Sequence, residues 1–307
     1  MTRRSAGRPQ VSVIACARNA AGRIASLLAG LAEQAARLDQ PVEIIVADSA
    51  SSDGTPGRVL RTAEECPGAA VRLVRLAEPG KCRALNAAVR QARGGILAFL
   101  DDDVIPAPDH LQRLLSAFGR PGGPDLLGGR VLARWRDGPP PAWFTPAVAA
   151  FTPAHDLGEG RVAYDPPFSS PVGANLAARR KVLEKIGLFD EALGHVGGRP
   201  YGAEECDLAF RAAKAGFRVA YDGGVSLAHP FSKAAWTPWA LKRRAFFQGA
   251  GMARFFALRG LLWRANPWLQ RGLSAGARKG VLSGRNALYF QLKALLYAGY
   301  LHEALLS

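Results

Sequence analysis

The stretch EPGKCRALNAAVRQARGGILAFLDDDV, residues 78–104, predicts a helix, a turn and a strand that ends in three consecutive aspartates. We expect the helix over residues 83–91, because the paired glycines Gly94 and Gly95 that follow it end regular structure. The run ILAFL at 96–100 is apolar at every position, which is typical of a strand buried on both faces of a parallel sheet. The segment therefore predicts an α/β fold with three carboxylates at the end of a central strand.

Further strands and helices alternate before this segment. Apolar runs rich in β-branched residues occur at 11–17 (VSVIACA), 42–48 (VEIIVAD) and 71–76 (VRLVRL), and apolar residues recur at helical spacing from Ile24 to Leu38. Strands that alternate with helices predict a mostly parallel, doubly wound sheet with right-handed crossovers. In such sheets the ligands lie beyond the carboxyl ends of the strands.

The second half of the chain shows the same elements with longer interruptions. Residues 119–171 are rich in Gly and Pro, which favours loops or short edge strands over one end of the sheet. Helices are expected at about 180–186 and 204–215, each stopped by a glycine, and a further strand at 217–224. The tail after Ser232 is expected to be mostly helical, with a break at Asn266-Pro267.

The 307 residues are 49% hydrophobic, which fits a globular protein with a real core. Four cysteines, Cys16, Cys66, Cys82 and Cys206, show no CxxC spacing, so we expect neither a zinc site nor a disulfide framework. Basic residues before the first apolar run imitate a signal peptide, but that run is short and stops at Arg18. We therefore interpret it as a strand and expect a cytoplasmic protein.

Positive charge is concentrated in the tail. The chain carries +15, and residues 232–307 hold twelve Lys or Arg and one acid, Glu303. We therefore divide the chain into a catalytic domain, 1–231, and a basic, amphipathic, mainly helical extension, 232–307. Basic residues among Trp, Phe and Leu suit a helix that lies on an anionic membrane surface, and equally a helical subdomain that packs its apolar side on the catalytic domain.

Four acidic groups and one histidine are candidates for chemistry. Alternation along an extended backbone predicts Asp101 and Asp103 on one side and Asp102 on the other. Carboxylates of this kind hold Mg²⁺ together with substrate phosphates, although a solvated acidic turn is the simpler alternative. Asp48 ends an earlier strand and could accept hydrogen bonds from a base or ribose. His229 would join a metal site only if the fold brings it near Asp103.

The sequence Glu204-Glu205-Cys206-Asp207 opens the expected helix at 204–215. Acids in a first helical turn can serve the helix dipole alone. Glu205, however, shares a face with Leu208, Ala209 and Ala212, and an inward carboxylate is costly unless it is paired or functional. Glu205 is therefore the best candidate for a general base.

These segments, in this order, resemble the inverting family 2 glycosyltransferases with the GT-A fold from about Val11 to His229. The resemblance implies a single catalytic base, Glu205, and a nucleotide-sugar donor such as a UDP-, dTDP- or GDP-sugar. It implies Mg²⁺ or Mn²⁺ on Asp101 and Asp103, with His229 as a further ligand, and a glycan or lipid-linked acceptor. The donor-binding positions implied are Ala15, Arg18, Asp48, Lys81, Arg83, Asn86, Asp101 and Asp102, and the acceptor-side positions are Gly173, Asn175 and Glu204.

Two departures from the family pattern bear on the reaction. The base position usually holds Asp after Glu, whereas here Glu205 follows Glu204, and its carboxylate reaches one methylene further. The QxxRW signature of processive synthases is absent from LKRRAFFQGAG at 241–251, and Arg254, Arg259 and Arg264 interrupt the apolar run that follows. We therefore expect transfer of a single sugar by a protein peripheral to the inner face of the plasma membrane.

Three other functions compete with this interpretation. A nucleotidyltransferase would carry a glycine-rich first loop with an activating basic residue, which ARNAAGR at 17–23 lacks. A non-catalytic module that binds polyanions or membranes fits the isoelectric point near 10.3, although we expect no nucleic-acid partner. A dehydrogenase would need GxGxxG after the first strand, and it is missing.

Overall fold

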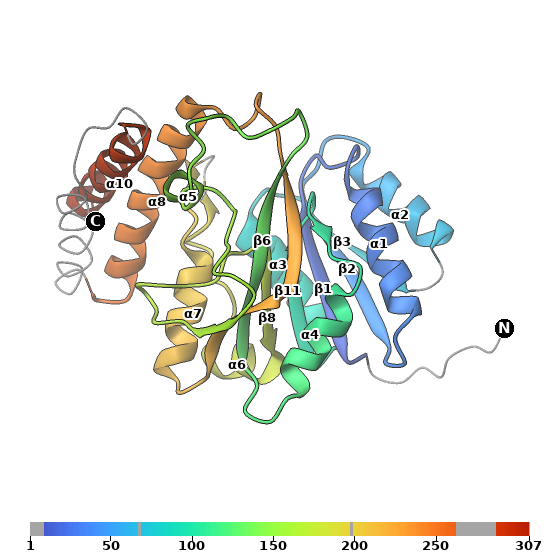
Figure 1. Ribbon diagram of the computed structural model, residues 1–307. Helices are drawn as coiled ribbons and strands as arrows, with labels where there is room; N and C mark the ends of the chain where they lie inside the picture. Colours follow the sequence, from blue (N-terminus) through green and yellow to red (C-terminus); the bar gives the residue numbers. More distant parts are fainter. Residues whose placement is uncertain (1–8, 67–68, 197–198, 262–286, 307) are drawn as a thin grey trace.

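The computed structural model describes residues 9–66, 69–196, 199–261 and 287–306, and within them one mixed sheet carries the fold (Figure 1). Its strands run in the order β3-β2-β1-β4-β8-β6-β11-β5, and β7 pairs with β11. Their bounds are β1 Val11–Ala17, β2 Val42–Ser49, β3 Ala70–Leu76, β4 Ile96–Asp101, β5 Ile105–Pro106, β6 Leu126–Trp135, β7 Arg161–Ala163, β8 Asn175–Arg179 and β11 Val219–Phe231. A short separate ladder joins β9 His195–Val196 to β10 Arg199–Pro200.

The helices surround this sheet. They are α1 Ile24–Ala36, α2 Thr55–Glu65, α3 Lys81–Gln91, α4 His110–Gly119, α5 Pro146–Ala149, α6 Arg180–Ile186, α7 Glu204–Lys214, α8 Pro238–Leu258 and α10 Ala287–Leu306. The expected helices at 180–186 and 204–215 are confirmed to within a residue. The helix expected at 83–91 begins two residues earlier, at Lys81, and α2 and α4 were not anticipated.

Parallel pairing brings the chemistry-bearing strand ends to one edge of the sheet. β1 pairs in parallel with both β2 and β4, and β2 pairs in parallel with β3. The register sets Ala17 opposite Asp48 and Cys16 opposite Asp101. The two acids that end separate strands therefore lie at the same level, as the doubly wound pattern predicts.

Alternation along the central strands produces two cores. Val13 and Ala15 of β1 face one side of the sheet, where they join side chains of α1 and α4. Ile14 of β1 and Phe99 of β4 face the other side, where α3, α6 and α7 pack. Because both faces are covered, β1 and β4 are apolar apart from Ser12, whose hydroxyl donates to Glu43, and the terminal Asp101.

Loops or short edge strands were expected over residues 119–171 because of their Gly and Pro content. This was wrong in part, because β6 is a ten-residue strand inside the sheet. Its two glycines lie where other groups come too close for a side chain. A Cβ on Gly128 would be 2.6 Å from the Tyr164 hydroxyl, and one on Gly129 would be 2.1 Å from Asn175 Nδ2. The glycines therefore permit close approach rather than mark a loop.

The strand expected at 217–224 is longer than predicted. It continues to Phe231 as β11, and a register shift between Asp222 and Ser226 accommodates the intervening glycines. The bulge keeps both halves paired with β6, so the strand reaches the edge where β4 ends. β11 thereby delivers His229 to that edge.

The described part of the extension packs on the rest of the molecule. A Cβ on Gly249 would be 1.7 Å from the Leu296 carbonyl oxygen, and one on Gly299 would be 1.9 Å from that of Phe246, so α8 and α10 touch backbone to backbone in opposite directions. A Cβ on Gly251 would be 2.3 Å from the carbonyl oxygen of Tyr201, so α8 also packs closely beside the residue that follows β10. The boundary at 231 and the contact with lipid remain predictions, and the break expected at Asn266-Pro267 lies outside the described residues. No helix among the described residues has the length and apolar character needed to cross a bilayer.

Candidate active site

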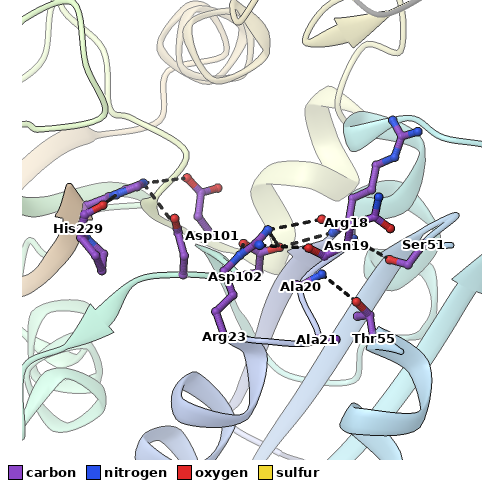
Figure 2. Close-up of polar contacts among 12 residues, drawn as sticks. Arg18, Asn19, Ala20, Ala21, Arg23, Ser51, Thr55, Asp101, Asp102 and His229 are labelled. Atoms are coloured by element: carbon purple, nitrogen blue, oxygen red, sulfur yellow. Dashed lines mark hydrogen bonds and ion pairs between the residues drawn. The ribbon is translucent and has the colours of Figure 1, made fainter. Parts of the chain in front are cut away.

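The aspartates after β4 point in the alternating directions that an extended backbone imposes. Asp101 Oδ2 lies 4.0 Å and Asp103 Oδ1 3.5 Å from His229 Nε2, and each aspartate side chain is 29% exposed (Figure 2). The expectation that Asp101 and Asp103 share one side is therefore confirmed, and β11 brings His229 to them. The fold thus brings His229 near Asp103, as a role for His229 in a metal site requires.

The charges of this triad fit a divalent cation. The Nδ1 of His229 lies 3.3 Å from the carbonyl oxygen of Pro230, so a proton on Nδ1 leaves the lone pair of Nε2 facing two carboxylates. Those three groups repel one another unless a proton or a cation lies between them. Within the described ranges no three His, Cys, Asp or Glu side chains are placed so that they could hold a metal ion by themselves. The residues present therefore fit an ion that takes further ligands from a bound diphosphate, which is how Mg²⁺ is usually held.

Asp102 points the opposite way and is already paired. Its carboxylate accepts hydrogen bonds from Nε of Arg23 at 2.8 Å and from Nη2 at 3.0 Å, and from the backbone N–H of Arg18 at 3.3 Å (Figure 2). This bidentate pair joins the end of β4 to the turn after β1. In this structure the Asp102 carboxylate holds the turn through this pair, and its expected contact with the donor remains a prediction.

The start of α7 lies across from the aspartates. Nζ of Lys81 is 3.1 Å from Oε1 of Glu205, 3.1 Å from Oε1 of Glu204 and 3.9 Å from Oδ1 of Asp101. Glu204 is 1% and Glu205 13% exposed at the side chain. One ammonium group thus joins the acid at the end of β4 to the two acids that open α7. Asp101 and Glu205 therefore converge on Lys81, whereas Asp103 takes no part in this contact.

Three carboxylates around one cation cannot all ionise with equal ease. Burial, followed by the neighbouring Glu204 carboxylate, raises the pKa of Glu205 to about 7. Burial also opposes ionisation of Glu204, but Lys81 outweighs it and holds the pKa of Glu204 below its ordinary value. Burial likewise opposes the charge on Lys81, yet the surrounding carboxylates keep its pKa well above the usual range. Glu205 is therefore the group that exchanges a proton near neutral pH.

Gly173 lies directly against these groups. A Cβ at this position would be 1.9 Å from Oε1 of Glu205 and 3.1 Å from Nζ of Lys81. The absence of a side chain at residue 173 is thus what allows the Glu205 carboxylate to occupy its position. The expectation that Gly173 lies in the site agrees with this geometry.

A cavity of about 680 Å³ opens beside Lys81, Glu204 and Glu205, and its size is typical of small-molecule sites. Several of its walls were not anticipated from the sequence. Cys16 borders it, and burial raises the pKa of that thiol to about 12, so it is a neutral lining group. The far wall comes from α8 and α10, including Arg244.

Arg244 is the most informative residue that the sequence analysis missed. It borders both this cavity and a second one, of about 460 Å³, that Asp103 and His229 line. Its Nε is buried and has no hydrogen-bond partner among the residues that the structure describes, and burial lowers the pKa of the guanidinium. A buried donor without a partner is costly unless a ligand satisfies it. The arginine pair in LKRRAFFQGAG was the only sequence signal.

The turns after β1 and β2 are fixed to each other beside Asp48. The N–H of Asn19 donates to Oγ of Ser51 at 2.9 Å, and the N–H of Ser52 donates to Oδ1 of Asn19 at 2.9 Å (Figure 2). Asp48 is fully buried and accepts from Nε of Arg75 at 3.3 Å. Its carboxylate is held in place at the end of β2, where the nucleoside was expected.

Two expected donor-binding residues lie in the first strand and in the turn that follows it. Ala15 is completely buried inside β1, so its methyl group contacts the core rather than a ligand. Arg18 is exposed, and its N–H and carbonyl are bonded to Asp102 and Arg23. Their expected contacts with the donor therefore remain predictions.

Three other expected site residues lie away from the cavity. Asn86 is buried and exchanges hydrogen bonds with the backbone of Phe189, donating at 2.9 Å and accepting at 3.0 Å. The Nδ2 of Asn175 donates to Val225 O at 2.9 Å and to Arg130 O at 3.1 Å. Arg83 pairs with Glu78 at 2.6 Å on the surface. The amides of Asn86 and Asn175 hold backbone segments, and Asn86 also donates to Oε1 of Glu191 at 3.2 Å; the expected contacts of these residues with the substrates remain predictions.

Comparison with known proteins agrees with this geometry. The model of Glycosyl transferase family 2 matches residues 12–187. Glycosyltransferase AglE of Haloferax volcanii is 28% identical over 222 residues, which cover 72% of this chain and 67% of AglE. An uncharacterized glycosyltransferase of Nostoc sp. is 26% identical over 151 residues, which span 49% of this chain and 46% of that protein.

Solved structures share the fold. The mannosyltransferase PcManGT from Pyrobaculum calidifontis, in complex with GDP-Man and Mn²⁺, superposes with a TM-score of 0.64 at 24% identity, over 97% of this chain and 88% of that one. S. aureus TarS 1–349 with UDP-GlcNAc gives 0.53 at 17% identity, over 96% and 90%. These likenesses identify a GT-A-type sheet with a helical extension. Since the family model covers more than half of its residues, the chain belongs to glycosyl transferase family 2.

Proposed function

We propose that this protein transfers one sugar from a nucleotide-diphosphate donor to an acceptor hydroxyl with inversion, and that Glu205 is the general base. One observation carries the proposal: Lys81 joins Glu205 to Asp101 on the border of a cavity of about 680 Å³. The base and the diphosphate site therefore face the same space. The family assignment supports a glycosyl transfer rather than a nucleotidyl transfer.

The donor lies along the edge formed by the ends of β1, β2 and β4. Asp48 contacts the nucleoside, and the cross-linked turns that carry Asn19 and Ser51 keep its pocket in shape. The relatives support a nucleotide sugar, since PcManGT is complexed with GDP-Man and TarS with UDP-GlcNAc. We propose a UDP-, dTDP- or GDP-sugar for this chain.

Asp101, Asp103 and His229 would hold Mg²⁺ or Mn²⁺, which would supply positive charge to the donor diphosphate. Arg244 adds a second positive charge from α8, because its unsatisfied Nε lies in the wall between the two cavities. Fixed donors of this kind stabilise developing negative charge without reorganisation.

The acceptor enters on the side of Gly173 and Glu205. The Glu205 carboxylate takes the proton of an acceptor hydroxyl while that oxygen attacks the anomeric carbon, and the bond from this carbon to the donor phosphate breaks on the opposite face. Lys81 keeps Glu204 ionised, so the proton goes to Glu205. A single displacement of this kind inverts the anomeric configuration.

Two variants test the division of roles. Glu205→Gln should reduce transfer by about 10²–10⁴-fold with unchanged donor affinity, since general base catalysis contributes that much. Asp103→Asn should instead weaken binding of the nucleotide sugar in the presence of Mn²⁺, measured by calorimetry. Transfer by Glu205→Gln at the normal rate would remove Glu205 from the mechanism.

We also propose a glycan or lipid-linked acceptor and a peripheral contact of the extension with anionic lipid on the inner face of the plasma membrane. The charge of residues 232–307 supports the contact, as do Trp239 and Leu305, which are 72% and 86% exposed. Flotation with vesicles that contain anionic lipid tests it, and flotation with neutral vesicles is the control. Equal recovery from the two would contradict an electrostatic contact.

A further inference from the structure

The outer part of the main cavity is built by the extension and by α5. Phe151, which follows α5, packs edge-on against Tyr289 of α10 with 6.3 Å between ring centroids. The side chains that α8 and α10 contribute to the wall are Arg244, Gln248, Met252, Tyr289, Lys293 and Leu296. Two of these are cations on an otherwise uncharged surface.

Lys293 has no counterion in the described part of the chain. Its ammonium lies 5.8 Å from the ring centroid of Tyr289, and burial lowers its pKa. No ion pair of the described residues includes it, and after Asp222 the only acid in the whole sequence is Glu303, which pairs with Arg254 at 3.5 Å. The residues between 262 and 286 contain neither Asp nor Glu. The extension therefore offers no spare carboxylate to Lys293.

The packing of the two helices separates Lys293 from the donor diphosphate. Because Gly249 touches Leu296 and Gly299 touches Phe246, the antiparallel register sets Lys293 level with Met252. Met252 follows Arg244 by eight residues on α8, which is about 12 Å along the helix axis. A diphosphate centred at Arg244 therefore lies about two helical turns from the level of Lys293. The two cations thus border different parts of the same cavity.

We propose that the acceptor carries an anionic group, a phosphate or a carboxylate, which binds Lys293 while its hydroxyl end lies at Glu205. The inference rests on the glycosyl transfer proposed above. Tyr289 and Phe151 contact the sugar or lipid part of the acceptor. Since Arg244 serves the donor, Lys293 is the cation of this wall that remains for the acceptor. Specificity for a charged acceptor thus comes from the extension rather than from the sheet.

The test compares matched probes that differ in charge. p-Nitrophenyl β-glucuronide and p-nitrophenyl β-glucoside form the carboxylate pair, and octyl phosphate and octanol form the lipid-phosphate pair. Binding to the full chain is measured by calorimetry with UDP or GDP and Mg²⁺ present. We expect the charged member of at least one pair to bind about tenfold more tightly, and the preferred pair identifies the source of the anion.

Variants assign the preference to the side chain. Lys293→Gln should abolish the difference within the pair, and Lys293→Arg should retain it. Lys242→Gln removes one charge from the same extension outside the cavity and should leave the preference intact. Equal affinity for charged and neutral probes, no binding by any charged probe, or the same loss in Lys242→Gln would overturn the inference.

Donor binding is followed in parallel. If GDP-mannose and UDP-GlcNAc both fail to bind the wild-type chain with Mg²⁺, the proposed function is in doubt, whatever the probes show. If a nucleotide sugar binds and the probe pairs behave alike, only the charged acceptor is refuted. Lys293→Gln should bind the nucleotide sugar as the wild type does.

Discussion

Gly173→Ala should inactivate the enzyme by displacing its base. The new Cβ would lie 1.9 Å from Oε1 and 2.9 Å from Cδ of Glu205, both far inside van der Waals contact. Glu205 must therefore rotate away, and the added carbon, 3.1 Å from Nζ of Lys81, also crowds the ammonium that orients it. Misplacement of a reacting group by about 1 Å costs on the order of 10²-fold in rate.

The assay separates chemistry from binding and folding. We expect kcat of Gly173→Ala to fall by about 10²-fold, because the displaced carboxylate no longer faces the acceptor hydroxyl. Affinity for the nucleotide sugar should stay within about tenfold of the wild type, since the base does not hold the donor. Gly160→Ala is the matched control: Gly160 has open space around its Cβ position, and the substitution should leave kcat unchanged.

A double variant tests the route of the effect. If Gly173 acts through Glu205, then Gly173→Ala should add little to the loss already caused by Glu205→Gln, because both changes remove the same interaction. Independent, multiplied losses would show that Gly173 serves the acceptor directly. Normal turnover by Gly173→Ala would refute the placement of the base altogether.

Three further predictions follow from the same site and from the core. The rate kcat/KM should rise with pH through an apparent pKa near 7, because Glu205 accepts a proton only when ionised, and a flat profile from about pH 5.5 to 8.5 would contradict this role. Arg244→Gln should weaken nucleotide-sugar binding about tenfold or more in calorimetry, and unchanged affinity would exclude Arg244 from the donor site. Gly94→Ala should destabilise the fold by about 1–3 kcal/mol in thermal or urea unfolding, because its Cβ would be 2.4 Å from the backbone nitrogen of Ser12, whereas Gly95→Ala, with 3.8 Å to the nearest atom, should cost clearly less.

The sequence predicted the part of the site that depends on strand direction. Once residues 96–100 are interpreted as a buried parallel strand, Asp101 and Asp103 must emerge together at its carboxyl end, and Asp48 must emerge beside them. The inward face of the helix at Glu205 followed from apolar spacing in the same way. These inferences need only local periodicity and one topological rule.

The chemistry of side-chain amides could not be inferred with the same certainty. Asn86 and Asn175 occur in family segments, and an amide has the same donors and acceptor whether its partner is a ligand or a backbone. In the structure the Asn86 amide bonds to the backbone of Phe189. The Asn175 amide donates to the carbonyl oxygens of Val225 and Arg130. Only tertiary contacts distinguish the two uses.

The extension shows why the rest of the site was not predictable. Arg244 and Lys293 looked like part of a uniformly basic tail, and charge counting assigned them to a surface. Their positions depend on Gly249 and Gly299, which bring α8 and α10 into backbone contact and set which residues face the cavity. Since the helices that wall the site belong to the basic extension, residues 232–307, a membrane contact of the extension would also bear on acceptor binding. Under the proposed function, the sheet and the extension form one site, in which the strand ends and Arg244 hold the donor and the wall of α8 and α10 meets the acceptor.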